Sequence, residues 1–271
     1  MKNFVLTFFF LSSFFALSQK RVILLDSITK NSIEYVNIKY LDSSYGTLTD
    51  SMGVFMLDKK KGKEILVSVL GYKEKKILTK NIVDTILLKQ KNLLLDEIII
   101  NNELHEEYGF HKKKSRFIRS KVKRVGLAVY IENKNEDTGR VITSINYKIR
   151  KRSKAISVVR AHLYTINKKT KKPDIELLDY NLLIRLRKRG LNDVRLDVSD
   201  KNISFPKDGI FVALEWVDST EFVDFGYSYS NKQGRTFITS FDSKKIIWTS
   251  FSVPPYDKNK IATASFGITV R

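Results

Sequence analysis

The chain has 271 residues, no cysteine, and 49 lysines and arginines against 29 acidic residues, which gives a net charge of +20. Its hydrophobic share of 42% is too high for a disordered chain, and its length allows two domains. Without cysteine the protein has no disulfides, thiolate metal sites or cysteine nucleophiles, so its stability must come from buried apolar side chains. The charge is uneven, because residues 19–104 hold 14 basic and 11 acidic residues whereas residues 105–271 hold 34 and 18.

Residues 1–18 have the pattern of a secretory signal peptide. Lys2 precedes an uninterrupted apolar run, and small residues at Ala16 and Ser18 fit cleavage after Ser18. The run is shorter than the ~20 apolar residues of a membrane span, which disfavours the alternative of an uncleaved anchor. No later segment is apolar enough to span a bilayer. We therefore expect an exported protein of the periplasm or outer membrane, with no transmembrane segment in the mature chain.

Short apolar runs alternate with turn signals over residues 19–100. Residues 36–40 alternate between apolar and polar side chains, which is typical of a half-buried strand. Asp50 and Gly53 have the residue types of a tight turn, and Phe55 directly after them is expected in the core. Many short strands at this spacing predict a small β-sandwich.

One motif in this region resembles a known family. Residues 46–55 read Gly-Thr-Leu-Thr-Asp-Ser-Met-Gly-Val-Phe, and residues 70–73 read Leu-Gly-Tyr-Lys. Together they resemble the carboxypeptidase regulatory-like domain, and residues 95–100 are similar to the strand that follows this domain in outer-membrane proteins of Bacteroidetes. The resemblance covers residues 19–100 and implies a transthyretin-like seven-stranded β-sandwich.

The resemblance implies no enzyme activity. Metallocarboxypeptidases hold zinc with a His-x-x-Glu pair, whereas Tyr108 stands where the glutamate would follow His105. Zinc sites need three or four convergent ligands, and neither the pair His105 and His111 nor His162 has such a pattern around it. Nucleophile elbows and phosphate-binding glycine loops are also absent from the sequence. We therefore expect no catalytic residue, no metal and no cofactor.

The sequence predicts a polar connector over residues 101–123 and a second sandwich over 124–271. Period-two alternation returns in several segments, among them 141–149, 159–164 and 194–198. The stretch from His162 to Trp216 is similar to jelly-roll-like domains that follow the regulatory-like domain in Bacteroidetes envelope proteins. These domains have no assigned function, so the likeness implies only a fold. The expected architecture is all-β, a transthyretin-like sandwich followed by a larger jelly-roll-like sandwich.

Basic residues on the polar phases of the second domain suggest a binding surface. If their strands share a sheet, its outer face attracts lipopolysaccharide, acidic glycans or an acidic protein, whereas the alternative is a basic surface that merely keeps the protein soluble. Nucleic acid is disfavoured because few aromatic residues interleave with the charges. The candidate anion-binding residues are Lys148, Arg150, Arg152, Arg160, Arg185, Arg187 and Arg195.

Two further hypotheses concern aromatic and acidic residues. Trp216 and Trp248 are candidates for stacking on a glycan, with core packing as the alternative. Acids from Glu215 to Asp224, including Asp218 and Glu221, are candidates for a glycan hydrolase, which needs paired carboxylates and a raised pKa on one of them. The favoured expectation is a non-catalytic binding or structural module of the cell envelope that contacts a glycan, a lipid head group or an outer-membrane protein.

Overall fold

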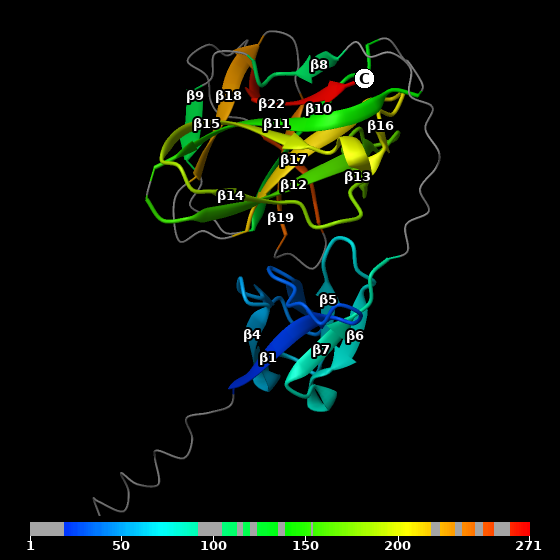
Figure 1. Ribbon diagram of the computed structural model, residues 1–271, viewed down its shortest axis with the longest axis vertical. Coiled ribbons are helices and arrows are strands. Elements are labelled where there is room, and N and C mark those ends of the chain that lie inside the picture. The colour runs from blue at the N-terminus through cyan, green and yellow to red at the C-terminus, as the bar shows by residue number, and fades with distance from the viewer. Residues whose placement is uncertain are drawn as a thin grey trace, which may run out of the picture. The chain divides into compact units, whose positions relative to one another are not determined.

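The computed structural model describes residues 19–91, 105–112, 116–119, 124–134, 139–152, 154–217, 223–230, 235–241, 246–251 and 261–271. These residues form strands joined by turns, which confirms the predicted all-β class (Figure 1). The helical elements in these ranges are the short 3-10 turns η2 (Lys59–Lys61), η3 (Thr79–Asn81) and η4 (Ser199–Lys201). None of them has the length and apolar character needed to cross a bilayer. By internal contacts the chain divides into two units, Met1–Asn92 and Leu93–Arg271.

Two sheets build the first unit. One has the order β4 (Val54–Asp58), β1 (Gln19–Asp26), β7 (Thr85–Leu88). The other has the order β3 (Gly46–Leu48), β2 (Asn37–Tyr40), β5 (Glu64–Ser68), β6 (Lys75–Leu78). Strand β1 is antiparallel to β4 and parallel to β7, and the second sheet is antiparallel throughout. The described strands of this unit number seven, as the family resemblance implies.

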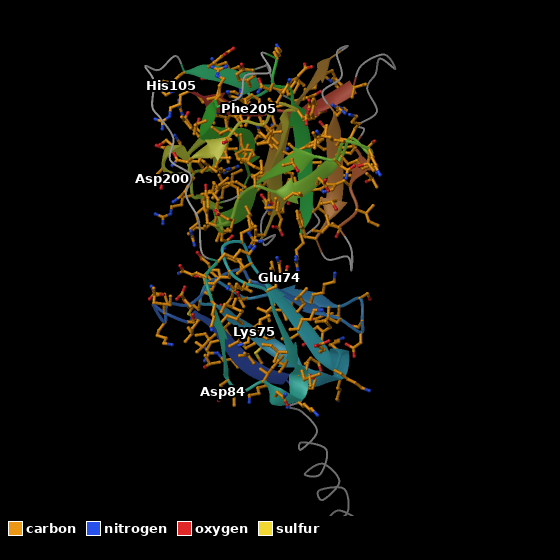
Figure 2. The ribbon with its side chains drawn as sticks, turned by 90° about the vertical axis from the view of Figure 1, so that its right-hand side faces the viewer. Glu74, Lys75, Asp84, His105, Asp200 and Phe205 are labelled. Carbon is orange, nitrogen blue, oxygen red and sulfur yellow. The ribbon has the colours of Figure 1, made fainter. Side chains whose placement is uncertain are left out.

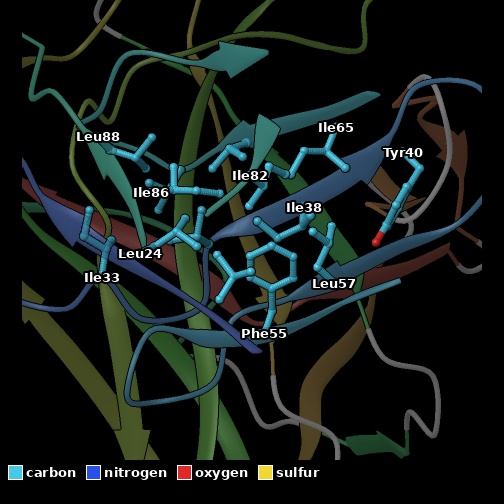
Figure 3. Packing of buried hydrophobic residues seen from close by; sticks show 14 residues of the cluster. Leu24, Ile33, Ile38, Tyr40, Phe55, Leu57, Ile65, Ile82, Ile86 and Leu88 are labelled. Carbon is cyan, nitrogen blue, oxygen red and sulfur yellow. The ribbon is translucent and has the colours of Figure 1, made fainter. Parts of the chain in front are cut away.

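Period-two alternation places the core of the first unit between its sheets. Leu24 of β1 and Phe55 of β4 point toward Ile38 of β2 and Ile65 of β5, and all four are buried (Figure 3). Each fully buried side chain of this size stabilises the fold by roughly 1.5–3 kcal/mol relative to its exposed state. The predicted core position of Phe55 is therefore confirmed.

The turn before Phe55 has the predicted chemistry. The Asp50 carboxylate accepts hydrogen bonds from the backbone N–H groups of Met52, at 2.8 Å, and Val54, at 2.9 Å. Gly53 has φ +74°, and a Cβ there would lie 3.0 Å from the Leu24 carbonyl oxygen, so the turn requires glycine. Turn chemistry accounts for these motif residues.

Two larger sheets build the second unit (Figure 1). The seven-stranded sheet has the order β13 (Pro173–Glu176), β12 (Ser157–Ile166), β17 (Ile210–Trp216), β10 (Val125–Ile131), β19 (Thr236–Ser240), β20 (Thr249–Ser250), with β14 (Leu183–Leu186) also on β12. The eight-stranded sheet has the order β21 (Ile261–Ala264), β18 (Val223–Ser230), β11 (Val141–Lys151), β22 (Phe266–Val270), β8 (Glu106–Gly109). On its branches, β15 (Gly190–Asp197) and β16 (Ile203–Ser204) pair with β11, and β9 (Arg116–Arg119) pairs with β18.

The two large sheets pack against each other through buried side chains. The Tyr147 hydroxyl of β11 donates a 2.8 Å hydrogen bond to the Ala213 carbonyl of β17. The rings of Trp216 in β17 and Phe225 in β18 lie 4.3 Å apart between centroids. These contacts define an inner face on each sheet, and the residues between them in sequence point to the outer faces.

The predicted connector contains strands. Strand β8 pairs with β22 and β9 pairs with β18, so both extend the eight-stranded sheet. Only Tyr108 of β8 is buried, whereas Glu106, Glu107 and Gly109 are exposed, so the strand has a single apolar residue. A one-residue apolar signal is too short to show a period of two, which is why the sequence suggested a connector.

Candidate functional site

Alternation along β11 separates apolar from polar side chains. Ile145, Tyr147 and Ile149 face inward, so Asn146 and Lys148 lie on the outer face of the eight-stranded sheet. The antiparallel partner β15 aligns Arg195 with Asn146 and Asp193 with Lys148. Residues from two strands thus meet on one sheet face.

A pocket of about 190 Å³ opens on this face. Lys112 pairs with Glu107 at 2.8 Å, and Lys148 lies 3.7 Å from Asp193. Within the described residues, the exposed Arg195 guanidinium forms no ion pair closer than 4.0 Å. The lining residues are His111, Lys112, Asn146, Tyr147, Lys148, Asp193, Val194 and Arg195, and we call this the cationic pocket.

The floor of the cationic pocket is a polar network. The Asn146 amide donates to the Thr269 hydroxyl at 3.1 Å, and the Ser144 hydroxyl donates to the same oxygen at 2.8 Å. All three side chains are buried. An asparagine amide carries two hydrogens, and this contact uses one of them. Asn146 itself lines the pocket, so this network lies directly beneath the cations.

His111 forms one wall because Gly267 has no side chain. A Cβ at Gly267 would collide with the imidazole Nδ1, so glycine allows the ring to lie on β22. Burial lowers the pKa of His111, while a 3.1 Å contact between its Nε2 and Glu107 opposes that effect. The net direction is downward, so the ring is neutral at pH 7.

Arg150 and Arg152, at the end of the same sheet, do not line the cationic pocket but pair with a buried carboxylate. Both guanidinium groups contact the buried Asp224 carboxylate, Arg150 at 2.8 Å and Arg152 at 2.7 Å. Arg150 also lies over the Phe117 ring, 4.5 Å from its centroid. Since a buried carboxylate is stable only when paired, the two arginines hold β18 against the end of β11.

A buried ionic network lies on the outer face of the seven-stranded sheet. Arg160 and His162 alternate along β12, and the register aligns Arg160 with Glu215 of β17. Glu215 lies 2.9 Å from Arg160 and 3.2 Å from the His162 Nε2, and Glu176 lies 2.7 Å from the His162 Nδ1. Two cationic side chains therefore face two carboxyl groups. We call these four residues the ionic network.

Aromatic rings cover most of the ionic network, while Glu176 at its edge stays partly exposed. The His162 ring is parallel to those of Tyr164 and Phe241, with centroids 5.6 and 5.3 Å away. A Cβ at Gly126 would lie 2.6 Å from the Phe241 ring, so glycine makes room for this cover. Glu215 is 0% exposed.

The electrostatic environment of the ionic network favours the charged forms of Glu215 and His162. Burial raises the pKa of Glu215, but Arg160 and His162 outweigh burial and bring it down to about 2. Burial lowers the pKa of His162, but Glu176 and Glu215 outweigh it and raise it to about 9. A general acid requires the opposite shift on its carboxyl group, so the network has the properties of a structural ion cluster.

The predicted basic residues divide between two sheets. Lys148, Arg150 and Arg195 lie on the eight-stranded sheet, with Arg152 directly after β11. Arg160 is buried in the seven-stranded sheet, 2% exposed, and Arg185 and Arg187 lie exposed at its β14 strand. The predicted single basic face therefore does not form. Only Lys148 and Arg195 meet at the cationic pocket, while His111, Lys112 and Asn146 were not candidates, two of them because they fall in the predicted connector.

The tryptophans lie in packed surroundings. Trp216 is 2% exposed and donates its indole N–H to the Val223 carbonyl at 3.1 Å. Trp248 is 6% exposed and packs edge-on against Tyr164. Neither ring presents a free face to a sugar in this structure.

The predicted acids do not converge in the described residues. Glu215 belongs to the seven-stranded sheet and Asp224 to the eight-stranded sheet, while Asp218 and Glu221 lie outside the described residues. His105 is exposed at the start of β8 (Figure 2), and within the described ranges no three His, Asp or Glu side chains are arranged to hold a metal ion.

Comparison with known proteins supports one part of this chain. The family model described as CarboxypepD_reg-like domain matches residues 23–100. Comparison with curated proteins gave no match. Residues 23–100 thus contain a carboxypeptidase regulatory-like domain, as their motif predicts, and a domain of this kind is non-catalytic.

Proposed function

We propose that the protein is an exported, non-catalytic binding module of the bacterial cell envelope, whose second unit contacts an anionic glycan, a lipid head group or an outer-membrane protein. The observation that carries the proposal is the cationic pocket, where Lys112, Lys148 and Arg195 surround a space open to ligand. Cations from three elements focus a positive potential into one cleft, which attracts anionic surfaces.

Three sequence features support the remaining parts of the proposal. The secretory pattern of residues 1–18 favours a periplasmic or outer-membrane location, although these residues lie outside the described ranges. The motif of residues 95–100 favours a Bacteroidetes origin, and the similarity of residues 162–216 favours a jelly-roll-like second unit. The hydrolase alternative is disfavoured, because the lowered pKa of Glu215 is the reverse of what an acid catalyst needs.

The test is binding of the full chain, purified after export from an expression host, to lipopolysaccharide, an acidic glycan and a neutral glycan at 50 and 300 mM salt. We expect binding to the two anionic ligands that weakens at the higher salt concentration, since salt screens exposed charges. Binding to the neutral glycan alone, or to none of the three ligands, would contradict the anionic-ligand proposal.

A further inference from the structure

The cationic pocket keeps one cation that is not neutralised by a contacting carboxylate in the described part of the chain. Its cations are Lys112, Lys148 and Arg195, and the carboxylates that contact them are Glu107 and Asp193. These two ion pairs leave Arg195 as the lining cation that no described carboxylate contacts within 4.0 Å, while Asp197, two residues further along β15, interacts with it from a greater distance. A ligand with at least one negative charge therefore gains electrostatic energy on entering.

Donors reach the pocket from several directions. Lys112 follows β8, Lys148 and Asn146 belong to β11, and Arg195 belongs to β15. The ammonium groups and the guanidinium group carry only donors and no acceptors. The volume of about 190 Å³ suits a small anionic group.

This donor arrangement distinguishes phosphate from carboxylate. A carboxylate accepts hydrogen bonds mainly in one plane, and a single arginine satisfies both of its oxygens. A phosphate has oxygens directed tetrahedrally, so it accepts from an arginine fork and from lysines on other sides at the same time. Three cations on separate elements therefore match a phosphate better.

Resting on the proposed function, we infer that the cationic pocket is a binding site for a phosphate group, with Arg195 as its main ligand and Lys148 and Lys112 as supporting ligands. The group reaches the pocket as a sugar phosphate, as the phosphate of a lipid head group or as free phosphate, because the same oxygens face the protein in each case.

The experiment titrates the full chain with inorganic phosphate, glucose 1-phosphate and vesicles containing phosphatidic acid, with glucuronate as the carboxylate comparison. We expect a lower Kd for the phosphate ligands than for glucuronate, and the preferred carrier identifies the source. Arg195→Gln should raise the Kd for phosphate by about tenfold, the effect of losing one charge-assisted hydrogen bond. Tighter binding of glucuronate would overturn the phosphate assignment.

The matched control is Arg187→Gln, which removes an exposed positive charge near β14 on the other sheet. This variant should change the Kd by less than about twofold, since exposed charges beyond a Debye length of ~8 Å are screened. If Arg195→Gln and Arg187→Gln weakened phosphate binding equally, the assignment of the cationic pocket would be wrong. Phosphate would then be attracted by the overall charge of the protein.

A second variant changes the pocket in the opposite direction. Asp193 is exposed and lies opposite Lys148, so Asp193→Asn removes a competing carboxylate without opening the core. We expect about threefold tighter phosphate binding, in line with the strength of exposed ion pairs. If phosphate binding were unchanged in both Asp193→Asn and Arg195→Gln, the cationic pocket would be excluded as the phosphate site.

The outcomes separate this inference from the proposed function. If lipopolysaccharide and the acidic glycan bind the wild type while phosphate binding does not depend on Arg195, the phosphate site is wrong and the anionic-ligand proposal stands. If neither envelope ligand binds while phosphate binding depends on Arg195, the proposed function fails and the phosphate site stands.

Discussion

At the residue scale, Glu215 is held by positive charge. Arg160 and His162 both contact its Oε2, and burial leaves water no access to the carboxylate. Glu215→Gln would leave two cations facing a neutral amide. Removing one partner of a buried ion pair costs roughly 3–5 kcal/mol, so we expect a loss of this size in the free energy of unfolding of the second unit, measured by urea denaturation.

The control for that measurement is an acid at the surface. Asp200 pairs with Lys201 at 2.8 Å and is largely exposed (Figure 2). Asp200→Asn should change the free energy of unfolding by less than about 1 kcal/mol. Similar losses in the two variants would show that the ionic network does not stabilise the fold.

The ionic network also predicts how stability depends on pH. The pKa of His162 is about 9 in the folded protein, above its usual 6.5, so its pairing with Glu176 and Glu215 stabilises fully below pH 6.5 and is lost as the pH rises through 9. Glu215 acts in the reverse direction, because its pKa is about 2 in the folded protein, below its usual 4.5. Its contribution to stability is therefore complete above pH 4.5 and is lost as the pH falls through 2. Both contributions are complete only between pH 4.5 and 6.5.

His162→Gln tests this window. Wild type should lose on the order of 3 kcal/mol of stability between pH 6.5 and 9.5, from 1.4 kcal/mol for each unit by which the pKa of His162 is raised. The variant should be less stable than wild type at pH 6, and it should lose less stability than wild type between pH 6.5 and 9.5. Chemical denaturation at several pH values measures both slopes, and parallel curves would rule out His162 as the titrating group.

The sequence identifies some of these residues without their roles. Arg160 has the spacing of a polar-face cation, and the structure buries it with Glu215, which comes 55 residues later in the chain. Alternation along one strand gives the face of a side chain, but it does not give what covers that face. Here the cover is Phe241 and Trp248 from a distant segment, and no local pattern predicts it.

At the scale of elements, β8 depends on glycine for its place in the sheet. Gly109 has φ +110°, and a Cβ there would lie 2.6 Å from the Phe266 carbonyl oxygen of β22. Gly109→Ala should detach the end of β8 and displace His111 from the cationic pocket. We expect a loss of stability of at least about 2 kcal/mol and weaker phosphate binding, measured by denaturation and titration.

Gly190 provides the matched control in the same unit. Its φ of +105° is nearly the same, but a Cβ there would meet no atom within 4 Å. Gly190→Ala therefore introduces the backbone strain without the collision, and it should lower the free energy of unfolding by about 1–3 kcal/mol. If Gly109→Ala costs no more than Gly190→Ala, close packing of β8 on β22 is not what requires glycine.

The predictability of elements follows their length and burial. The alternating residues 141–149 predict β11 because one face of that long strand is buried along its whole course. Strands β8 and β9 are four residues each and lie at branches or edges, so their sequences show almost no period. The turn at Asp50 was predictable because its hydrogen bonds are local, whereas the pairing of β8 with β22 depends on residues far apart in the chain.

At the scale of the whole molecule, the proposed export predicts the N-terminus of the mature protein. If residues 1–18 are a signal peptide, the exported protein begins at Gln19, the first residue of β1. Intact-mass measurement of protein purified from the envelope fraction should give the mass of residues 19–271. A mass that includes residues 1–18 would support the anchored alternative instead.

The pairing of β1 with β7 has a consequence for when the first unit folds. These are the first and last strands of that unit, and they lie side by side in register from Ile23 with Thr85 to Asp26 with Leu88. Contacts between residues so far apart form slowly, because a long loop must close before any contact is gained. A chain that emerges from its N-terminus can therefore pair β1 with β4 first, and it completes the three-stranded sheet of the first unit only after residue 85 has followed.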